Sequence, residues 1–183
     1  MNEIVKQELM NKIALTLALF LMASGLAGAQ TLISEQSIVK FSIKNLKVRT
    51  VEGTFTGMAG EIRFVEDDPA NAAFLVSVDA ASVNTENKRR DDHLRSEDFF
   101  DVEKYPAIRF ESDTIQKTTE GFTTRGRLSL HGVTREVEIP FTFDDNQFKG
   151  HLEINRLDYK VGEGTGTFTA GEIASLEILV VVE

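Results

Sequence analysis

The sequence contains no cysteine and no tryptophan among its 183 residues. Without cysteine the chain forms no disulfide and carries no lipid on an N-terminal cysteine, so its fold must be stable on its core alone. Positive charge is also scarce, because 20 Lys and Arg stand against 29 Asp and Glu, which gives a net charge of -9. Nucleic acids are bound by concentrated positive charge, so we expect no nucleic-acid partner.

The common signatures of catalysis and of metal binding are missing as well. The sequence has no Gly-x-Ser-x-Gly, no Gly-rich phosphate loop and no His-Glu-x-x-His. Ser129 and His131 would be the members of a catalytic triad, but they stand two apart where a predicted strand enters a turn. His93, His131 and His151 are isolated from one another, whereas a metal site needs three or four ligands. We predict no catalytic residues, no cofactor and no metal site.

The N-terminus has the pattern of an export signal. Its apolar run over residues 13–23 is about half of what a spanning helix needs, and it is followed by the small residues Ala27, Gly28 and Ala29. We expect a signal peptide over residues 1–29, with Met10 as an alternative start and an uncleaved anchor as the competing interpretation. Cleavage after Ala29 would leave no stable membrane anchor and would place the protein in the periplasm or outside the cell.

Apolar residues alternate with a period of two over most of the remaining chain. Such alternation is typical of strands with one buried face, and Gly, Asn, Asp and Pro mark the turns between them. The segments that show it are 37–44, 61–66, 72–80, 107–112, 121–132, 136–143, 148–154 and 176–182. Consecutive strands without intervening helices pair antiparallel and close to avoid free edges. We predict one all-β domain over residues 30–183, an antiparallel barrel of about eight strands.

One charged segment, residues 84–105, interrupts this run of strands. Asn84 or Thr85 has the side chain to cap a first short helix, and Ser96 to cap a second. Opposite charges four residues apart are predicted to pair across single helical turns, namely Lys88 with Asp92 and Asp91 with Arg95. We therefore interpret the segment as a helical lid over one end of the barrel, with Phe99 and Phe100 plugging that end.

Four stretches carry a resemblance to a known family. They read "VEGTFTGMAGEIRF", "RDDHLRSEDFFDVEKYPAIRFES", "GRLSLHGVTREVEIPFTF" and "INRLDYKVGEG". In this order they resemble the YceI family of lipid-binding, polyisoprenoid-binding periplasmic proteins, and the resemblance extends from about Ser37 to Val182. Two positions depart from the family pattern, since Gln36 and Asn45 stand where that family often has His. No role of those imidazoles is transferred to this chain.

The resemblance implies a lipocalin-like barrel whose apolar interior holds a long isoprenoid chain or similar amphiphile, with a helical insertion at residues 84–105. The ligand would be a polyprenyl phosphate or an isoprenoid quinone. An eight-stranded barrel is either filled by its own side chains or open to one small ligand, so the inward residues are lining candidates and core candidates alike. The lining candidates are Phe41, Ile43, Phe64, Phe74, Val76, Val78, Phe110, Leu128, Leu130 and Phe141.

The polar head of such a ligand needs donors at the mouth of the barrel. Arg90, His93 and Arg95 are the candidates, because guanidinium and imidazole groups donate to phosphate. The competing interpretation is that they are structural, with Arg95 paired to Asp91. For the whole protein, the alternatives to a lipid carrier are a filled, structural or stress-related secreted module and, third, an enzyme. Members of the family can dimerise, so a homodimer is a further candidate.

Overall fold

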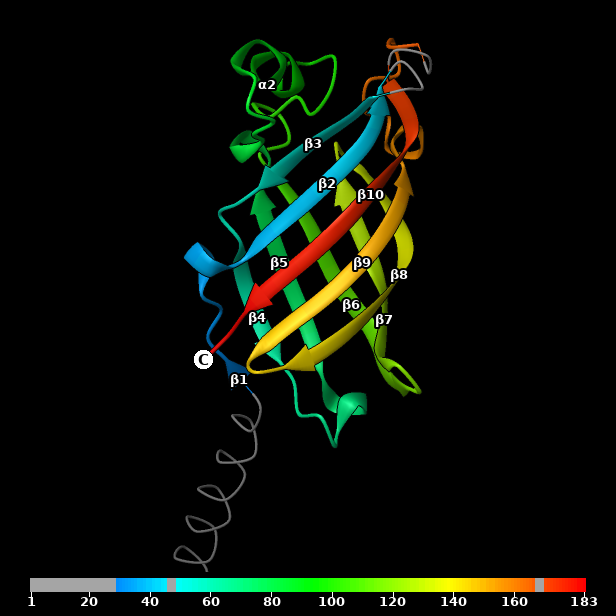
Figure 1. The fold of residues 1–183 in the computed structure, drawn as a ribbon. Coiled ribbons are helices and arrows are strands. Elements are labelled where there is room, and N and C mark those ends of the chain that lie inside the picture. Colours follow the sequence, from blue (N-terminus) through cyan, green and yellow to red (C-terminus); the bar gives the residue numbers. More distant parts are fainter. Residues whose placement is uncertain (1–28, 46–48, 167–169) are drawn as a thin grey trace, which may run out of the picture.

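The computed structural model describes residues 29–45, 49–166 and 170–183 (Figure 1). The expected signal peptide lies outside the described residues except for Ala29, and so does the alternative start at Met10. Within these described ranges no helix is long and apolar enough to cross a bilayer.

Ten strands and one short α-helix, joined by 3₁₀ turns, form the described part of the chain. The elements are β1 (Ala29–Gln30), β2 (Ile38–Asn45), β3 (Arg49–Phe55), β4 (Ala59–Arg63), β5 (Ala73–Asp79), α2 (Lys88–Arg95), β6 (Ala107–Thr118), β7 (Gly121–Leu130), β8 (Val133–Asp144), β9 (Gln147–Asn155) and β10 (Ala170–Val181). All strands belong to one sheet in the order β1-β4-β5-β6-β7-β8-β9-β10-β2-β3, and all neighbours are antiparallel. The predicted all-β, antiparallel fold class is confirmed.

Each of the eight alternating segments contains a strand, and the sequence pattern missed two further strands. β1 has only two residues, too few for a periodic signal. β3 carries Val51 and Phe55 on its inner face, but Gly53 stands between them and breaks the apolar alternation. Gly53 allows close packing here, because a Cβ at this position would run into the ring of Phe41 and the methyl group of Thr85.

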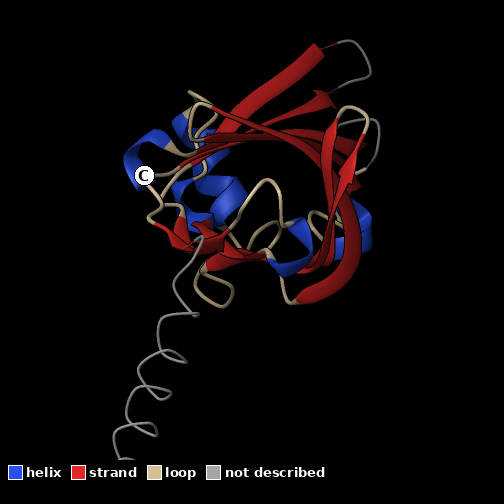
Figure 2. Cartoon of the chain, turned by 90° about the horizontal axis from the view of Figure 1, so that it is seen from below, coloured by secondary structure: helices blue, strands red, loops and turns tan. Residues whose placement is uncertain are grey.

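The sheet curls around a central interior, which the end-on view of Figure 2 shows. At one end the chain after β1 closes the ring: Thr31 exchanges two backbone hydrogen bonds of 2.9 Å with Glu183, and the amide of Ile33 donates to the carbonyl of Val181. At the other end β3 continues the sheet beyond β2, and its outer side meets the lid segment through the bridge between Thr54 and Asn84. The barrel therefore has two different ends. At the end where residues 31–33 pair with residues 181–183, called the sealed end below, the ring of strands is closed by backbone hydrogen bonds, and at the other end the lid segment lies against β3.

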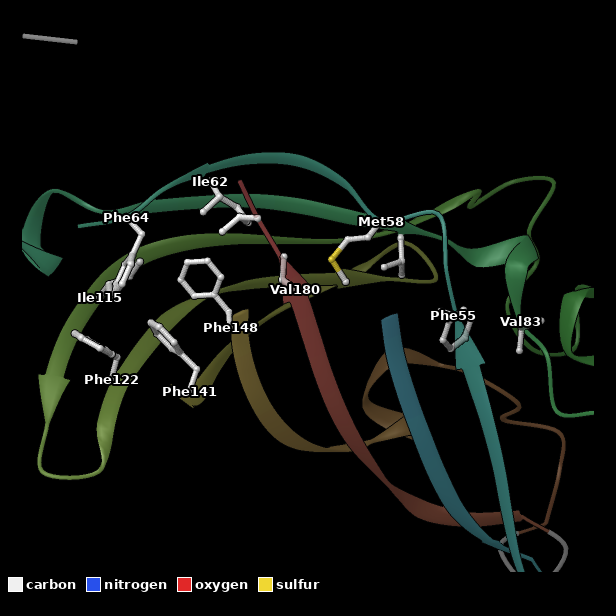
Figure 3. Close-up of a cluster of buried hydrophobic side chains, with 12 residues drawn as sticks. Phe55, Met58, Ile62, Phe64, Val83, Ile115, Phe122, Phe141, Phe148 and Val180 are labelled. Carbon is white, nitrogen blue, oxygen red and sulfur yellow. The ribbon is translucent and has the colours of Figure 1, made fainter. Parts of the chain in front are cut away.

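Two groups of buried side chains, which overlap along the barrel, pack inside the curled sheet. Figure 3 shows Phe64, Phe122, Phe141 and Phe148 close together near the sealed end, while Phe55 lies at a distance from them. The second group lies toward the lid and includes Phe99, Phe110, Leu128, Leu130, Ile139, Tyr159 and Val161. The space that remains between these groups is the candidate site.

Candidate functional site

A cavity of about 390 Å³ runs through the interior of the curled sheet. Its wall is made by inward side chains of β2 to β10 and by the lid segment, and almost all of them are apolar. Several lining residues are only half-buried although they face inward, because the cavity exposes them; these are Phe41, Ile43, Val76, Leu152, Ile154 and Leu176. The volume falls in the range of about 300–1,000 Å³ that is typical of small-molecule sites.

Nine of the ten predicted lining residues line this cavity. They are Phe41, Ile43, Phe74, Val76, Val78, Phe110, Leu128, Leu130 and Phe141. Phe64 does not: it is 3% exposed and lies behind the cavity wall, in ring contact with five other phenylalanines. Sequence reasoning also missed lining residues in the apolar phase of predicted strands, among them Val39, Phe148, Leu152, Ile154, Ile178 and Val180.

Phenylalanine rings close the cavity at the sealed end. Phe74, Phe141 and Phe148 line it and contact one another, with centroids 5.4–6.0 Å apart. Phe64 packs behind all three, and the ring of Phe143 lies tilted against that of Phe148, with centroids 4.4 Å apart. Edge-to-face and offset pairs of this kind are favourable, so this end is a packed, mainly aromatic floor.

The lid segment at the opposite end contains one helix, and its caps differ from the predicted ones. Asn87 caps α2, since its Oδ1 accepts a hydrogen bond from the amide of Arg90. Thr85 cannot serve as the cap because its hydroxyl binds Arg90 and Asp91 instead. The second helix predicted from Ser96 is wrong: the chain forms turns there, and the Ser96 hydroxyl donates back to the carbonyl of His93.

The turns after α2 change the prediction for Phe99 and Phe100. We expected them to plug the barrel end, since neighbours on a helix cannot face one cavity. Because they lie on a turn, both line the cavity, and Phe100 contacts Phe55 edge-to-face at 5.3 Å. The ring of Phe99 also meets the ring of His93 at 5.0 Å.

The three candidates for a head-group contact separate into two groups. Arg90 and His93 line the cavity, and the His93 side chain is 57% exposed, so it marks a place where the cavity meets solvent. Arg95 does not line it: its guanidinium donates to the carbonyls of Ala81 and Val83 and anchors the lid instead. The prediction for Arg95 is therefore wrong, because the carbonyls of the preceding turn hold its side chain away from the interior.

Charged groups on the lid pair partly as predicted. Lys88 and Asp92 form the expected bridge at 2.7 Å, whereas Arg95 pairs with Asp92 at 3.4 Å and not directly with Asp91. Asp91 is buried and accepts hydrogen bonds from the amide and the hydroxyl of Thr85. Burial raises the pKa of Asp91, but these two bonds and the charges of Arg95 and Arg90 outweigh it and lower the pKa below its ordinary value.

Arg156 is a buried cation in the cavity wall that sequence reasoning did not single out. It is 4% exposed, and no carboxylate of the described residues forms a salt bridge with it. Its five N–H groups all donate to backbone carbonyls, those of Val161, Gly162, Thr165, Ala170 and Gly171, at 2.6–3.1 Å. Burial lowers the pKa of the guanidinium, and the charge of Glu172 opposes this shift. The only sequence signal was its place in "INRLDYKVGEG".

Ser129 and His131, the imagined triad members, have structural partners. The hydroxyl of Ser129 shares a hydrogen bond of 2.8 Å with Thr134 across the hairpin. His131 lies in the turn with a φ of 50°, and its Nδ1 is 3.2 Å from the carbonyl of Tyr159. Over the described ranges, no three His, Asp or Glu side chains gather as they would around a metal ion.

Comparison with known proteins gives one family and a group of similar chains. Residues 31–182 match the model described as YceI-like domain. The UPF0312 protein of Serratia proteamaculans is 36% identical over 125 residues, which cover 67% of this chain and 65% of that protein. The UPF0312 protein of Photorhabdus laumondii is 37% identical over 123 residues, which cover 66% and 64%. The chain thus spans slightly less than two thirds of the length of these relatives.

Solved structures share the fold over most of their length. Burkholderia cenocepacia BcnA has a TM-score of 0.76 and 25% identity, covering 83% of this chain and 99% of that one. The Campylobacter jejuni YCEI protein has a TM-score of 0.65 and 27% identity, with coverages of 76% and 89%. A polyisoprenoid binding domain from Saccharophagus degradans has a TM-score of 0.65 with coverages of 86% and 98%, but at 15% identity it shows the fold alone.

Proposed function

Since the chain belongs to the YceI-like domain family, we propose that it binds an isoprenoid or similar amphiphilic lipid in its cavity and carries or sequesters it without chemistry of its own. The observation that carries the proposal is the apolar wall around about 390 Å³. Each methylene-sized group that leaves water for such a wall contributes about 0.8 kcal/mol, so a hydrocarbon tail is the kind of ligand that it favours.

The cavity also distinguishes the two ends of an amphiphile. Its floor is made of phenylalanine rings, whereas Arg90 and His93 line it at the lid. A phosphate or quinone head therefore belongs at the lid, where Arg90 supplies a charged donor, and the tail points to the floor. Arg90 is partly engaged, since its Nε and Nη2 donate to Thr85, so a head group would meet the remaining Nη1.

Two further features support a lipid carrier. The domain from Saccharophagus degradans that shares this fold is a polyisoprenoid binding domain. The alternative of a filled structural module requires a packed interior, and the open volume argues against it. The family and its structural neighbours suggest a binding protein rather than an enzyme. We further propose export to the periplasm or the exterior, on the strength of the N-terminal pattern.

The test compares two substitutions on one strand. Val76 faces the cavity from β5, and its neighbour Leu75 is 50% exposed on the outer face. An unpaired amide in the apolar wall costs about 1–3 kcal/mol, so we expect Val76→Asn to weaken the binding of farnesyl phosphate about fivefold or more, while Leu75→Asn leaves it unchanged. Calorimetric titration of the folded variants measures this. Equal affinities for the two variants would contradict binding in the cavity.

A further inference from the structure

We infer that the exported chain begins with pyroglutamate at position 30, formed by cyclisation of Gln30, and that this neutral ring protects the segment that closes the barrel from aminopeptidases. The inference rests on the export part of the proposed function, because cleavage after Ala29 makes Gln30 the first residue. It does not depend on the lipid. It follows from the place of the cleavage, the unpaired amide oxygen of Gln30 and the bonds that the next residues make.

Gln30 lies directly after the predicted cleavage point. The small residues at positions 27–29 precede it, and it is the second residue of the two-residue strand β1, opposite Ile62 on β4. Removal of Ala29 by cleavage also removes the pair between Ala29 and Arg63, so Gln30 becomes the terminal pair of this ladder. Terminal residues fray readily, which leaves the new α-amine accessible to its own side chain.

The side-chain amide of Gln30 is not held by its oxygen. Among the described residues, Oε1 is buried and has no hydrogen-bond partner, which is a costly state for a polar atom. Rotation of the side chain back toward its own α-nitrogen brings Cδ within reach, because glutamine has the length that closes a five-membered ring. The start of β1 thus places an amide whose oxygen has no partner beside the amine that cleavage creates.

The cyclisation needs no partner molecule. Near neutral pH a part of any population of α-amino groups is unprotonated and therefore nucleophilic. The α-nitrogen attacks Cδ, the N–Cδ bond forms, the Cδ–Nε2 bond breaks, and Nε2 leaves as ammonia with the proton that the amine gives up. The product is an uncharged lactam that keeps one N–H at the backbone nitrogen, so β1 retains a donor at this position.

The residues behind this ring close the barrel at the sealed end. Thr31 exchanges two backbone hydrogen bonds of 2.9 Å with Glu183, and the amide of Ile33 donates to the carbonyl of Val181 at 2.8 Å. Figure 1 shows the C-terminus of the chain beside β1. An aminopeptidase removes residues one by one from a free amine, so trimming through residue 33 would remove these bonds. Pyroglutamate has no free amine, and the trimming stops before its first step.

Mass spectrometry of the protein that a bacterial host exports from the full-length precursor tests the ring. We expect an intact mass lower by one ammonia than that of residues 30–183, with the loss on residue 30 of the N-terminal peptide, and no signal in stepwise N-terminal sequencing. Gln30→Asn is the matched variant: it keeps an amide but would need a strained four-membered ring, so it should show a free amine.

The outcomes of this measurement separate the ring from the cleavage. A chain that starts at residue 30 with its amide intact would overturn the inference and leave the proposed cleavage standing. A chain that starts at another residue, or that keeps residues 1–29, would overturn both.

Digestion with an aminopeptidase tests the protection. We expect the wild-type protein to keep its N-terminus, whereas Gln30→Asn is trimmed and its melting temperature falls by at least about 4 °C once residue 33 is lost. Treatment with a peptidase that removes pyroglutamate should make the wild-type protein as sensitive as the variant. Equal trimming of the two untreated proteins, whether complete or absent, or an unchanged melting temperature of a chain trimmed beyond residue 33, would overturn the protective role.

Discussion

Replacement of Arg156 by lysine should destabilise the protein strongly, although the charge is kept. The guanidinium connects the start of the turn after β9 to carbonyls at Val161, Gly162, Thr165, Ala170 and Gly171, and so it shapes one part of the cavity wall. All five of its donors are used, and the side chain is 4% exposed, so water cannot take over the bonds that are lost.

The magnitude follows from the donor count. An ammonium group has three donors where the guanidinium has five, so at least two carbonyls lose their partner. Hydrogen bonds to a charged group contribute about 1.5–3 kcal/mol each, which gives a loss of about 3–6 kcal/mol in the free energy of unfolding. Against a total of about 5–15 kcal/mol for an ordinary domain, this is a large fraction.

The assay is urea unfolding followed by far-ultraviolet circular dichroism. Arg135→Lys is the matched control: Arg135 is half-exposed and lies 3.8 Å from Asp158, so the same chemical change there should cost less than about 1 kcal/mol. If Arg156→Lys also costs less than about 1 kcal/mol, the carbonyl bonds do not hold this region and the reasoning fails.

Two further substitutions test the lid and the sheet. Asp91→Asn should lower the free energy of unfolding by about 1–3 kcal/mol at neutral pH, because a charged acceptor of two Thr85 hydrogen bonds is lost. The pKa of Asp91 is lowered by folding, so its contribution is complete above the ordinary value of 3.8 and is lost progressively as the pH falls through the lowered pKa. The difference between the urea midpoints of the two proteins should therefore be smaller at about pH 2.5 than at about pH 6. Gly126→Ala should destabilise by more than about 1 kcal/mol, since its Cβ would run into the carbonyl of Glu111 on β6, and an unchanged melting temperature would refute this close approach.

Alternation along the strands predicts which face a residue presents, but not its depth along the barrel. Phe64 and Phe141 both face inward as expected, yet only Phe141 lines the cavity, because Phe64 is covered by the rings around it. Strand β3 was not predicted because Gly53 interrupts its apolar alternation. The small residue lets Phe41 and Thr85 approach, and this contact exists only in the packed sheet.

The lid and the hydrogen bonds of Arg156 depend on contacts between residues that a local sequence pattern does not connect. Thr85 was a plausible helix cap, but in the folded chain its hydroxyl binds Arg90 and Asp91, so Asn87 takes that role. Among the described residues Arg156 has no carboxylate partner, since its acceptors are carbonyls of the turns that follow it and of the start of β10, 5 to 15 residues later. Sequence periodicity therefore predicts the wall of the site well and its two ends poorly.

The most direct test of lipid enclosure is native mass spectrometry of the protein purified from the cells that produce it naturally, followed by organic extraction. We expect one hydrocarbon-tailed molecule bound per chain and released by the solvent, with its retention abolished or weakened in Val76→Asn and kept in Leu75→Asn. A protein that is purified without a ligand and also fails to take up added prenyl phosphates and quinones would contradict lipid enclosure, and would favour a structural module without a lipid ligand.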